Sequence, residues 1–259
     1  MAREWLEKNV ANNRPVSDSF VIKYGLDMME GRWQYNGDPI RFDTEDRLID
    51  GQHRLHACVE ARVPFETDVI FGLAPEAIRT IDIGRSRTAG HIAHFEGAQN
   101  ASAACAIAGL ILLHRKHGIQ NLNDPRCQPT KPQVVEAVRT LQGLDEAVAQ
   151  AGMLGKKIAP PRVVGFCYYQ FAAQNREVAR RFFEELGYGV NLSLDSPVYL
   201  LRERLLTDRL AKAKLPQLEI VALFFKAWRF YRENRPLRKL FWKRDGAAPE
   251  KFPDIGEAA

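Results

Sequence analysis

Strand-like segments occur only in the first 98 or so residues of this 259-residue chain, and this asymmetry most constrains its fold. Each is a short, mainly apolar run next to polar or turn-forming residues, as expected for a strand. They are residues 39–42, 48–49 and 64–71. After about residue 98, apolar residues recur at spacings of three and four, which is typical of helices. The sequence therefore predicts an α+β fold.

The change from strand-like to helical patterns also predicts the domain organisation. Residues 1–97 are expected to form a small mixed α/β domain, and residues 98–245 an all-helical domain. Residues 246–259 have the composition of a loose end and are expected to form a flexible tail. The expected helices of the second domain span residues 101–116, 133–141, 144–153, 163–173, 178–186, 198–213 and 218–233.

A glycine marks the junction between a predicted strand and a predicted helix. Gly51 follows the strand at 48–49 and precedes a helical run that begins at Gln52. Glycine at such a turn lets the backbone approach a ligand closely, and the free N–H groups of the first helical turn attract anions. The guanidinium of Arg54 suits phosphate oxygens, and Asp50 suits a magnesium ion or a hydroxyl group. This order of residues predicts a phosphate or nucleotide site.

The same residues have a second interpretation. Gly51 can serve the geometry of a tight turn alone, with Arg54 paired to Asp50 or Glu60 on a solvated surface. Composition and spacing leave both interpretations open.

Residues 49–57, IDGQHRLHA, resemble the Asp-Gly-Gln-His-Arg signature of one branch of the ParB/sulfiredoxin-like superfamily. This branch includes phage and prophage proteins, and the resemblance covers roughly residues 10–95. It implies a ParB/sulfiredoxin-like fold for the first domain. In this superfamily the corresponding turn binds nucleotide phosphates: partition proteins bind CTP there, and sulfiredoxins and a free-serine kinase use ATP or ADP. The resemblance implies a nucleoside triphosphate, with ATP favoured, accompanied by magnesium.

The chain departs from two members of the superfamily at this turn. Sulfiredoxins place their catalytic cysteine within the turn, whereas this chain has Gln52 there and its nearest cysteine is Cys58. Partition proteins usually carry Gly-Glu-Arg-Arg, whereas this chain has Gly51 followed by Gln52, His53 and Arg54. We therefore expect neither sulfinic-acid repair nor CTP-gated clamping.

The motif and the resemblance together predict a nucleotide-dependent activity. We expect an NTP-dependent phosphotransferase or NTPase that acts on or beside DNA, in a phage DNA-modification pathway. The residues expected to bind the nucleotide phosphates are Arg14, Gly51, Gln52, His53 and Arg54. The residues expected to act in catalysis are Asp50 and His53.

A second arginine-bearing loop lies near the end of the first domain, at residues 82–88. Gly84 permits an unusual turn, and Arg85 and Arg87 are suited to distal phosphates. We take Asp82 and Arg85 as secondary phosphate-site candidates. The alternative is a surface loop that leads into the helical domain.

The C-terminal part of the helical domain is strongly basic. Residues 200–244 contain 13 Lys or Arg and 4 Asp or Glu, with aromatic residues interleaved. Basic side chains contact phosphates and aromatic rings stack on unpaired bases, so DNA is a candidate partner. The alternative is an amphipathic helix with its aromatics inward, which we favour for the aromatic residues. The candidate nucleic-acid-binding residues are Arg229, Arg232, Arg235 and Arg238.

Two other functions remain open. One is a non-enzymatic, partition-like DNA-binding protein that senses a nucleotide, with a helix-turn-helix at residues 130–153. The other is a nuclease, for which the sequence shows no convincing cluster of carboxylates.

The remaining sequence features exclude several classes of site. Three His-x-x-His pairs have no third ligand at a recognised spacing, and the four cysteines form no Cys-x-x-Cys pair, so no metal site is expected. The longest apolar stretch, residues 101–113, is shorter than the roughly 20 residues of a membrane-spanning helix. We expect a cytoplasmic protein, in the host cytoplasm if phage-encoded, with no membrane partner. The oligomeric state stays open.

Overall fold

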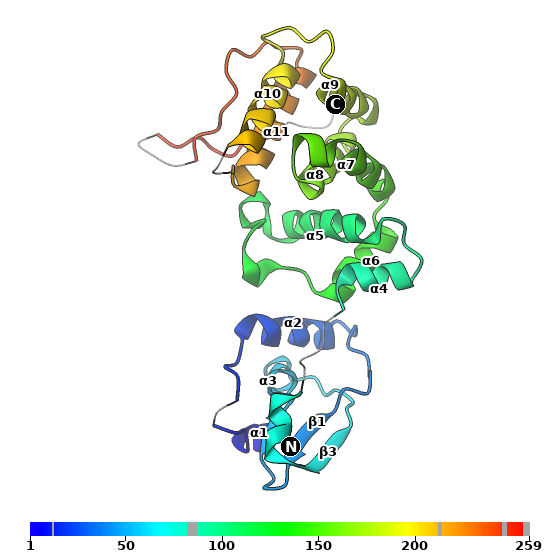
Figure 1. Ribbon diagram of the computed structural model, residues 1–259, viewed down its shortest axis with the longest axis vertical. Helices are drawn as coiled ribbons and strands as arrows, with labels where there is room; N and C mark the ends of the chain where they lie inside the picture. Colours follow the sequence, from blue (N-terminus) through cyan, green and yellow to red (C-terminus); the bar gives the residue numbers. More distant parts are fainter. Residues whose placement is uncertain (12, 82–86, 212–213, 245–247, 256–259) are drawn as a thin grey trace. The chain divides into compact units, whose positions relative to one another are not determined.

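The computed structural model describes most of the chain (Figure 1). The described residues are 1–11, 13–81, 87–211, 214–244 and 248–255, without the side chain of Lys156. Within them, every strand precedes residue 74, and the remainder consists of helices and loops. The predicted α+β class is confirmed.

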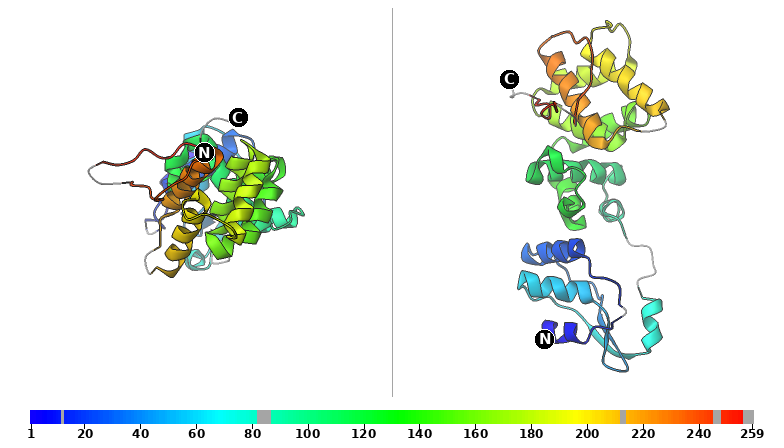
Figure 2. Two further views of the ribbon diagram at one scale, coloured as in Figure 1. Left: turned by 90° about the horizontal axis from the view of Figure 1, so that it is seen from above. Right: turned by 90° about the vertical axis from the view of Figure 1, so that its left-hand side faces the viewer.

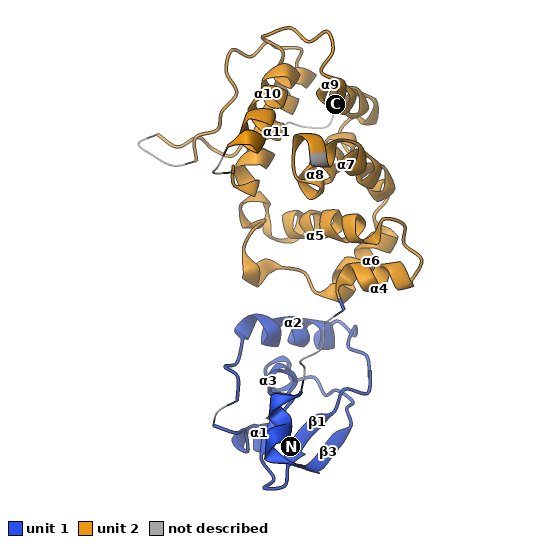
Figure 3. Cartoon of the chain, in the orientation of Figure 1, with its two compact units in different colours: residues 1–87 blue, residues 88–259 orange. Residues whose placement is uncertain are grey.

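The chain forms two compact units, residues 1–87 and residues 88–259 (Figure 3). The boundary expected from the sequence, after residue 97, is therefore too late. Helix α4 (Ala89–Phe95) belongs to the second unit, because its buried Ala93 packs in the same core as Ala101 and Ala104 of the next helix. A helix of seven residues is too short for its sequence alone to assign it to a domain.

The first unit is a small sheet with helices packed against it. Its three strands have the order β2-β1-β3, with β1 antiparallel to β2 and parallel to β3. The hairpin expected between the first two strands is present, and the Asp43 carboxylate accepts hydrogen bonds from the backbone N–H groups of Glu45 and Arg47 at 2.9 Å. The elements are α1 (Ala2–Glu7), α2 (Asp18–Met29), β1 (Ile40–Asp43), β2 (Leu48–Asp50), α3 (Gln52–Ala61), β3 (Val69–Leu73) and the 3-10 helix η1 (Pro75–Arg79).

Two apolar clusters stabilise this unit. Ile40, Phe42 and Leu48 from the sheet pack with Leu55 from α3, and all four are buried. On the other face of α3, Ala57 packs with two residues of α2, consistent with the side-by-side course of α2 and α3 in Figure 2. The helix that carries the motif is thus held on two faces.

The second unit is all-helical within its described residues and has one extensive core. The aromatic residues of its last helix face inward, as favoured from the sequence: Trp228 is fully buried and stacks on Phe171 with ring centroids 4.6 Å apart. No described helix is both long and apolar enough to cross a membrane. After α4 the helices are α5 (Ala101–His117), α6 (Lys131–Thr140), α7 (Leu144–Ile158), α8 (Pro161–Ala172), α9 (Arg176–Tyr188), α10 (Pro197–Leu210) and α11 (Gln217–Arg232), with short 3-10 turns η2 (Ile119–Asn121) and η3 (Pro125–Cys127).

The segment expected to be a flexible tail instead packs on the helical unit, as far as residues 248–255 are concerned. Phe252 contacts the rings of Phe225 and Trp242, with centroids 5.6 and 5.4 Å apart. Glu250 forms an ion pair with Lys226 at 2.9 Å. The contacts of a partly buried aromatic residue and one ion pair outweigh the loop-like composition of this segment.

Replacing Gly51 with alanine should destabilise the first unit by about 2–4 kcal/mol. Gly51 has φ +102°, and an added Cβ would lie 2.3 Å from Cδ1 of Ile40, which is fully buried and cannot move freely. Gly37→Ala is the matched control, because Gly37 also has positive φ but has no atom within 4 Å of the added Cβ. Urea unfolding, followed by hydrogen exchange in peptides of residues 1–87, measures the loss of stability in the two variants. Equal losses for the two variants would contradict the packing argument.

Candidate functional site

The turn between β2 and α3 forms part of the wall of a cavity of about 270 Å³ within the first unit. Four of the residues predicted from the sequence meet here, namely Arg14, Asp50, Gly51 and Gln52. His53 and Arg54 are not among the lining residues. The described lining residues are Asn13, Arg14, Ile49, Asp50, Gly51, Gln52, Ile78, Arg79 and Ile81.

The backbone at the start of α3 has the character expected of an anion site. Gly51 precedes the helix in a left-handed conformation, and no side chain caps this end. Among the described residues, nothing accepts a hydrogen bond from the backbone N–H groups of Gln52, His53 or Arg54. Such N–H groups, together with the helix dipole, attract negative charge.

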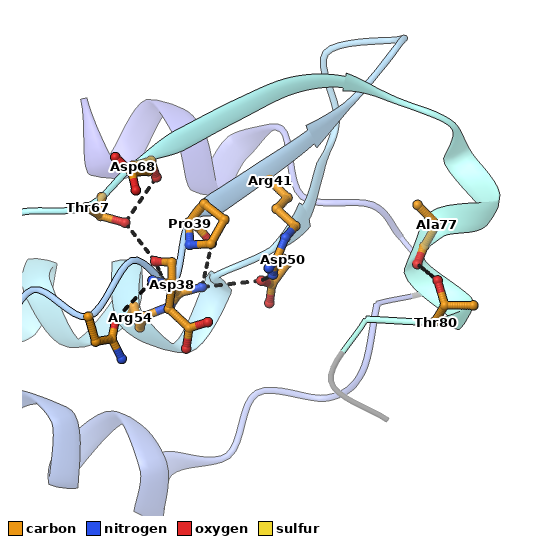
Figure 4. Close-up of polar contacts among 10 residues, drawn as sticks. Asp38, Pro39, Arg41, Asp50, Arg54, Thr67, Asp68, Ala77 and Thr80 are labelled. Atoms are coloured by element: carbon orange, nitrogen blue, oxygen red, sulfur yellow. Dashed lines mark hydrogen bonds and ion pairs between the residues drawn. The ribbon is translucent and has the colours of Figure 1, made fainter. Parts of the chain in front are cut away.

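Asp50 and Arg54 form a buried ion pair that has a third member. One carboxylate oxygen of Asp50, Oδ2, accepts hydrogen bonds from Arg41 and, at 3.3 Å, from Arg54 (Figure 4). The side chains of Asp50 and Arg54 are only 7% and 12% exposed. The sequence left the Asp50–Arg54 pairing open as an alternative but placed it on a solvated surface. The structure shows the pairing of Asp50 with Arg54, but it places the pair in a largely buried position instead of on a solvated surface.

Arg54 has further partners in the backbone. Its guanidinium donates to the carbonyl oxygen of Asp38 and, at 2.8 Å, to that of Pro39, as Figure 4 shows. With these bonds and the pair to Asp50, the guanidinium binds the start of β1. These donors of Arg54 are directed at protein groups, and its expected role in holding a phosphate stays a prediction.

His53 is also engaged inside the protein. Its Nε2 accepts a hydrogen bond from the backbone N–H of Ser17 at 3.0 Å, and its ring meets that of Phe20 edge-on. Burial, followed by the nearby positive charges of Arg14 and His56, lowers the pKa of His53, while Asp50 opposes this shift. His53 is thus a neutral acceptor that joins α3 to α2. Its expected catalytic role is not supported by this position.

The Gln52 side chain positions the N-terminal segment at the cavity. Its Nε2 donates to the carbonyl oxygen of Arg14 at 2.7 Å, and its Oε1 accepts from Asn9 Nδ2 at 2.9 Å. These two bonds fix the backbone of Arg14 beside the start of α3. The contribution of the Gln52 side chain to this site is therefore to hold Arg14 in position at the cavity.

Arg79 is a site residue that the sequence did not reveal. It is the last residue of η1, its side chain is exposed, and it makes no ion pair within the described part of the chain. The start of this short helix after Ala74 is visible in the sequence, but nothing in the sequence indicates that its end returns to the cavity. Among the described lining residues, Arg14 and Arg79 add two positive charges to a wall whose carboxylate, that of Asp50, is paired with two arginines.

The structure does not settle the second predicted loop. Asp82 and Arg85 lie outside the described residues.

The four C-terminal arginines do not form a continuous free basic face. Arg229 and Arg235 share Glu233, at 3.1 and 2.7 Å, which lowers the pKa of that carboxyl. Arg232 donates to Gln174 Oε1 at 3.1 Å. Of the four, only Arg238 has no hydrogen bond or ion pair within the described residues. The role of these four arginines in binding nucleic acid stays a prediction.

The helix-turn-helix alternative meets an electrostatic obstacle. Helices α6 and α7 are joined by a short turn, as that alternative requires. However, the first turn of α7 carries Asp145 and Glu146, where a recognition helix would approach DNA. Glu146 is paired with Arg176 at 2.7 Å, so the charge left to repel phosphates at that position is that of Asp145, and the helix-turn-helix stays an alternative.

Metal-binding groups are sparse. Within the described residues, no three His, Cys, Asp or Glu side chains are grouped to hold a metal ion. Among the described residues of the cavity wall, Asp50 supplies the one carboxylate.

Comparisons with known protein families, curated proteins and solved structures give no match for this chain. The resemblance to the ParB/sulfiredoxin-like superfamily thus depends on the motif alone and stays a prediction.

The buried His53 makes the stability of the first unit pH-dependent. Because its pKa is lowered on folding, the unfolded chain binds the proton more readily. Stability should be full above the ordinary histidine pKa of about 6.5, fall as the pH drops below it, and level off below the folded pKa. Hydrogen exchange of residues 1–87 at a series of pH values measures this decline.

His53→Gln is the informative variant for that measurement. Glutamine keeps an acceptor for the Ser17 N–H but does not titrate, so the decline should become smaller. An unchanged pH profile in this variant would contradict the assignment to His53.

Proposed function

We propose that the first unit binds the phosphate groups of a nucleoside triphosphate, with ATP favoured. The main support is the meeting of three anion-attracting features at one cavity: the backbone N–H of Gln52 at the start of α3, Arg14 and Arg79. A guanidinium has the planar geometry that suits phosphate oxygens.

The size of the cavity indicates which part of the nucleotide it holds. Pockets that enclose a whole small molecule usually have volumes of about 300–1,000 Å³. At about 270 Å³ this cavity suits the phosphates, with the nucleoside bound outside it.

The residues present also fit a magnesium ion that accompanies the phosphates. Magnesium is typically held by one or two carboxylates, phosphate oxygens and water. Asp50 supplies one carboxylate: its Oδ2 is paired with the arginines, and its Oδ1 has no hydrogen-bond partner among the described residues. In this arrangement the ion would neutralise phosphate charge, and Asp50 would hold it on the cavity wall.

On this proposal the protein is an NTP-dependent phosphotransferase or NTPase that acts on or beside DNA in phage DNA modification. A nucleotide sensor without turnover is the second candidate, as in a partition-like protein. A specific observation favours it: Asp50 is already paired with two arginines, and His53 is buried away from the cavity. Binding is common to both candidates, and turnover separates them.

Removing both cavity arginines should weaken nucleotide binding. We expect the Arg14→Gln/Arg79→Gln variant to bind ATP with magnesium at least about tenfold more weakly, because charge-assisted hydrogen bonds to phosphate are lost. Calorimetric titration measures the affinity. Arg3→Gln is the control, since Arg3 is an exposed residue of α1 that does not line the cavity. Wild-type affinity in the double variant would remove the basis for the proposal.

Asp50→Asn separates binding from turnover. The variant keeps the backbone donors and Arg14, so we expect it to retain most of the nucleotide affinity. Loss of the carboxylate should lower any phosphate release or transfer at least about 100-fold and cost about 1–3 kcal/mol of stability. Unchanged turnover in a folded variant would contradict the role of Asp50. Absence of turnover in the wild-type protein, with binding intact, would favour the sensor.

A further inference from the structure

A second, larger cavity lies entirely within the helical unit, with a volume of about 680 Å³. It is formed by α9, the loop before α10, the start of α10 and the end of α11. Its lining consists of Val178, Arg181, Glu185, Ser193, Asp195, Ser196, Pro197, Phe230, Tyr231, Arg232, Asn234, Arg235 and Pro236. It is thus a polar cavity with three arginines and two carboxylates.

One of the two carboxylates is already engaged in the wall. Glu185 Oε1 accepts a hydrogen bond from the Tyr231 hydroxyl at 2.8 Å. Burial, and then this bond, raises the pKa of Tyr231, so Tyr231 stays a neutral donor to Glu185. Arg181 lines the same cavity, and its positive charge acts on the pKa of Tyr231 in the opposite sense.

Two of the three arginines are suited to bind an anion in the cavity. Arg181 is exposed and makes no ion pair or hydrogen bond with any described residue. Arg235 is held in place by Glu233 at 2.7 Å and by the ring of Phe230, whose centroid lies 4.8 Å from the guanidinium carbon. Both residues line the cavity; the Arg181 guanidinium is available, and that of Arg235 is held in one orientation.

The start of α10 adds uncharged donors and a favourable dipole. This helix has 14 residues, and the Ser196 hydroxyl at its N-cap accepts from the backbone N–H of Tyr199. The N-terminal end of a helix of this length favours negative charge. Ser193 and Asn234 provide further hydrogen-bonding groups on the lining.

We propose that this cavity binds a small phosphate monoester, whose phosphate oxygens are held by Arg181 and Arg235. The guanidinium geometry matches phosphate, and the serine hydroxyls and the Asn234 amide suit the hydroxyl groups of the ester. The volume falls in the range of small-molecule pockets. This site is independent of the nucleotide site in the first unit. It also gives Arg235 a more specific role than a place on an extended nucleic-acid surface.

The test is a calorimetric titration of the full chain with ribose 5-phosphate, with ribose as the uncharged control. We expect ribose 5-phosphate to bind and ribose not to bind. Arg181→Gln should weaken binding about tenfold, whereas Arg180→Gln should leave it unchanged. Arg180 is the neighbour of Arg181 on α9, is paired with Glu177 at 3.2 Å and does not line the cavity.

Asp195→Asn is expected to change the affinity for ribose 5-phosphate in the opposite direction to Arg181→Gln. Asp195 lines the cavity, and its carboxylate makes no hydrogen bond or ion pair within the described residues. Its removal should strengthen binding a few-fold, because a negative charge beside the phosphate is lost. A merely structural change would not raise the affinity.

Several results would overturn this proposal. One is the absence of ribose 5-phosphate binding by the wild-type protein, and another is unchanged affinity in both Arg181→Gln and Asp195→Asn. A third is binding of a single-stranded oligonucleotide that requires Arg181 while ribose 5-phosphate does not bind, since the ligand would then be a polymer.

The Arg14→Gln/Arg79→Gln variant keeps the two sites distinguishable. Ribose 5-phosphate binding that survives in this variant and depends on Arg181 supports the cavity in the helical unit, whatever the outcome with ATP. If the binding depends instead on Arg14 and Arg79, the inference fails while the nucleotide site stands.

Discussion

The fold of the first unit depends on the buried carboxylate of Asp50. Its Oδ2 takes Arg41 from β1 and Arg54 from α3, and Arg54 in turn binds two carbonyl oxygens ahead of β1. A charge as buried as this one is costly unless it is paired, and loss of one partner leaves the others uncompensated. The pairing therefore fixes β1, β2 and the start of α3 relative to one another. Gly51 must bridge them in a left-handed conformation.

This constraint divides the motif into a structural part and an exposed part. The side chains of Gln52, His53 and Arg54 all bind other segments of the same unit. The backbone N–H groups of the same residues have no partner among the described residues. The side chains thus hold the turn rigid, and the turn presents its backbone at the cavity. Rigid backbone donors bind an anion with little further ordering, so the structural role of the side chains is compatible with ligand binding.

The sequence predicted what depends on local pattern. The three strands, the hairpin, the glycine at the strand-to-helix junction and most of the helices follow from apolar spacing and turn residues, which act over a few positions. The direction of the Arg54 guanidinium, the bond from Ser17 to His53 and the position of Arg79 depend on contacts between segments far apart in the chain. A motif specifies residue types at given spacings, but it does not specify whether their side chains face inward. The sequence did not predict where α4 and residues 248–255 belong for the same reason, since both are held on the second unit by packing against its core.

In the C-terminal basic stretch, the number of basic residues in the sequence overstates how many of them are without an acidic partner in the structure. Its positive excess in the sequence suggests a broad phosphate-binding face, yet Glu233 alone pairs with two of the four selected arginines. One carboxylate offsets only one of the two positive charges, so the group of Arg229, Glu233 and Arg235 keeps a net positive charge, and the pairing mainly fixes where its donors point. It does not prevent short-range recognition, since a paired guanidinium still has donors and is held in one orientation. The same arrangement therefore favours a confined anion site, where Arg235 is pre-positioned and Arg181 supplies the uncompensated charge.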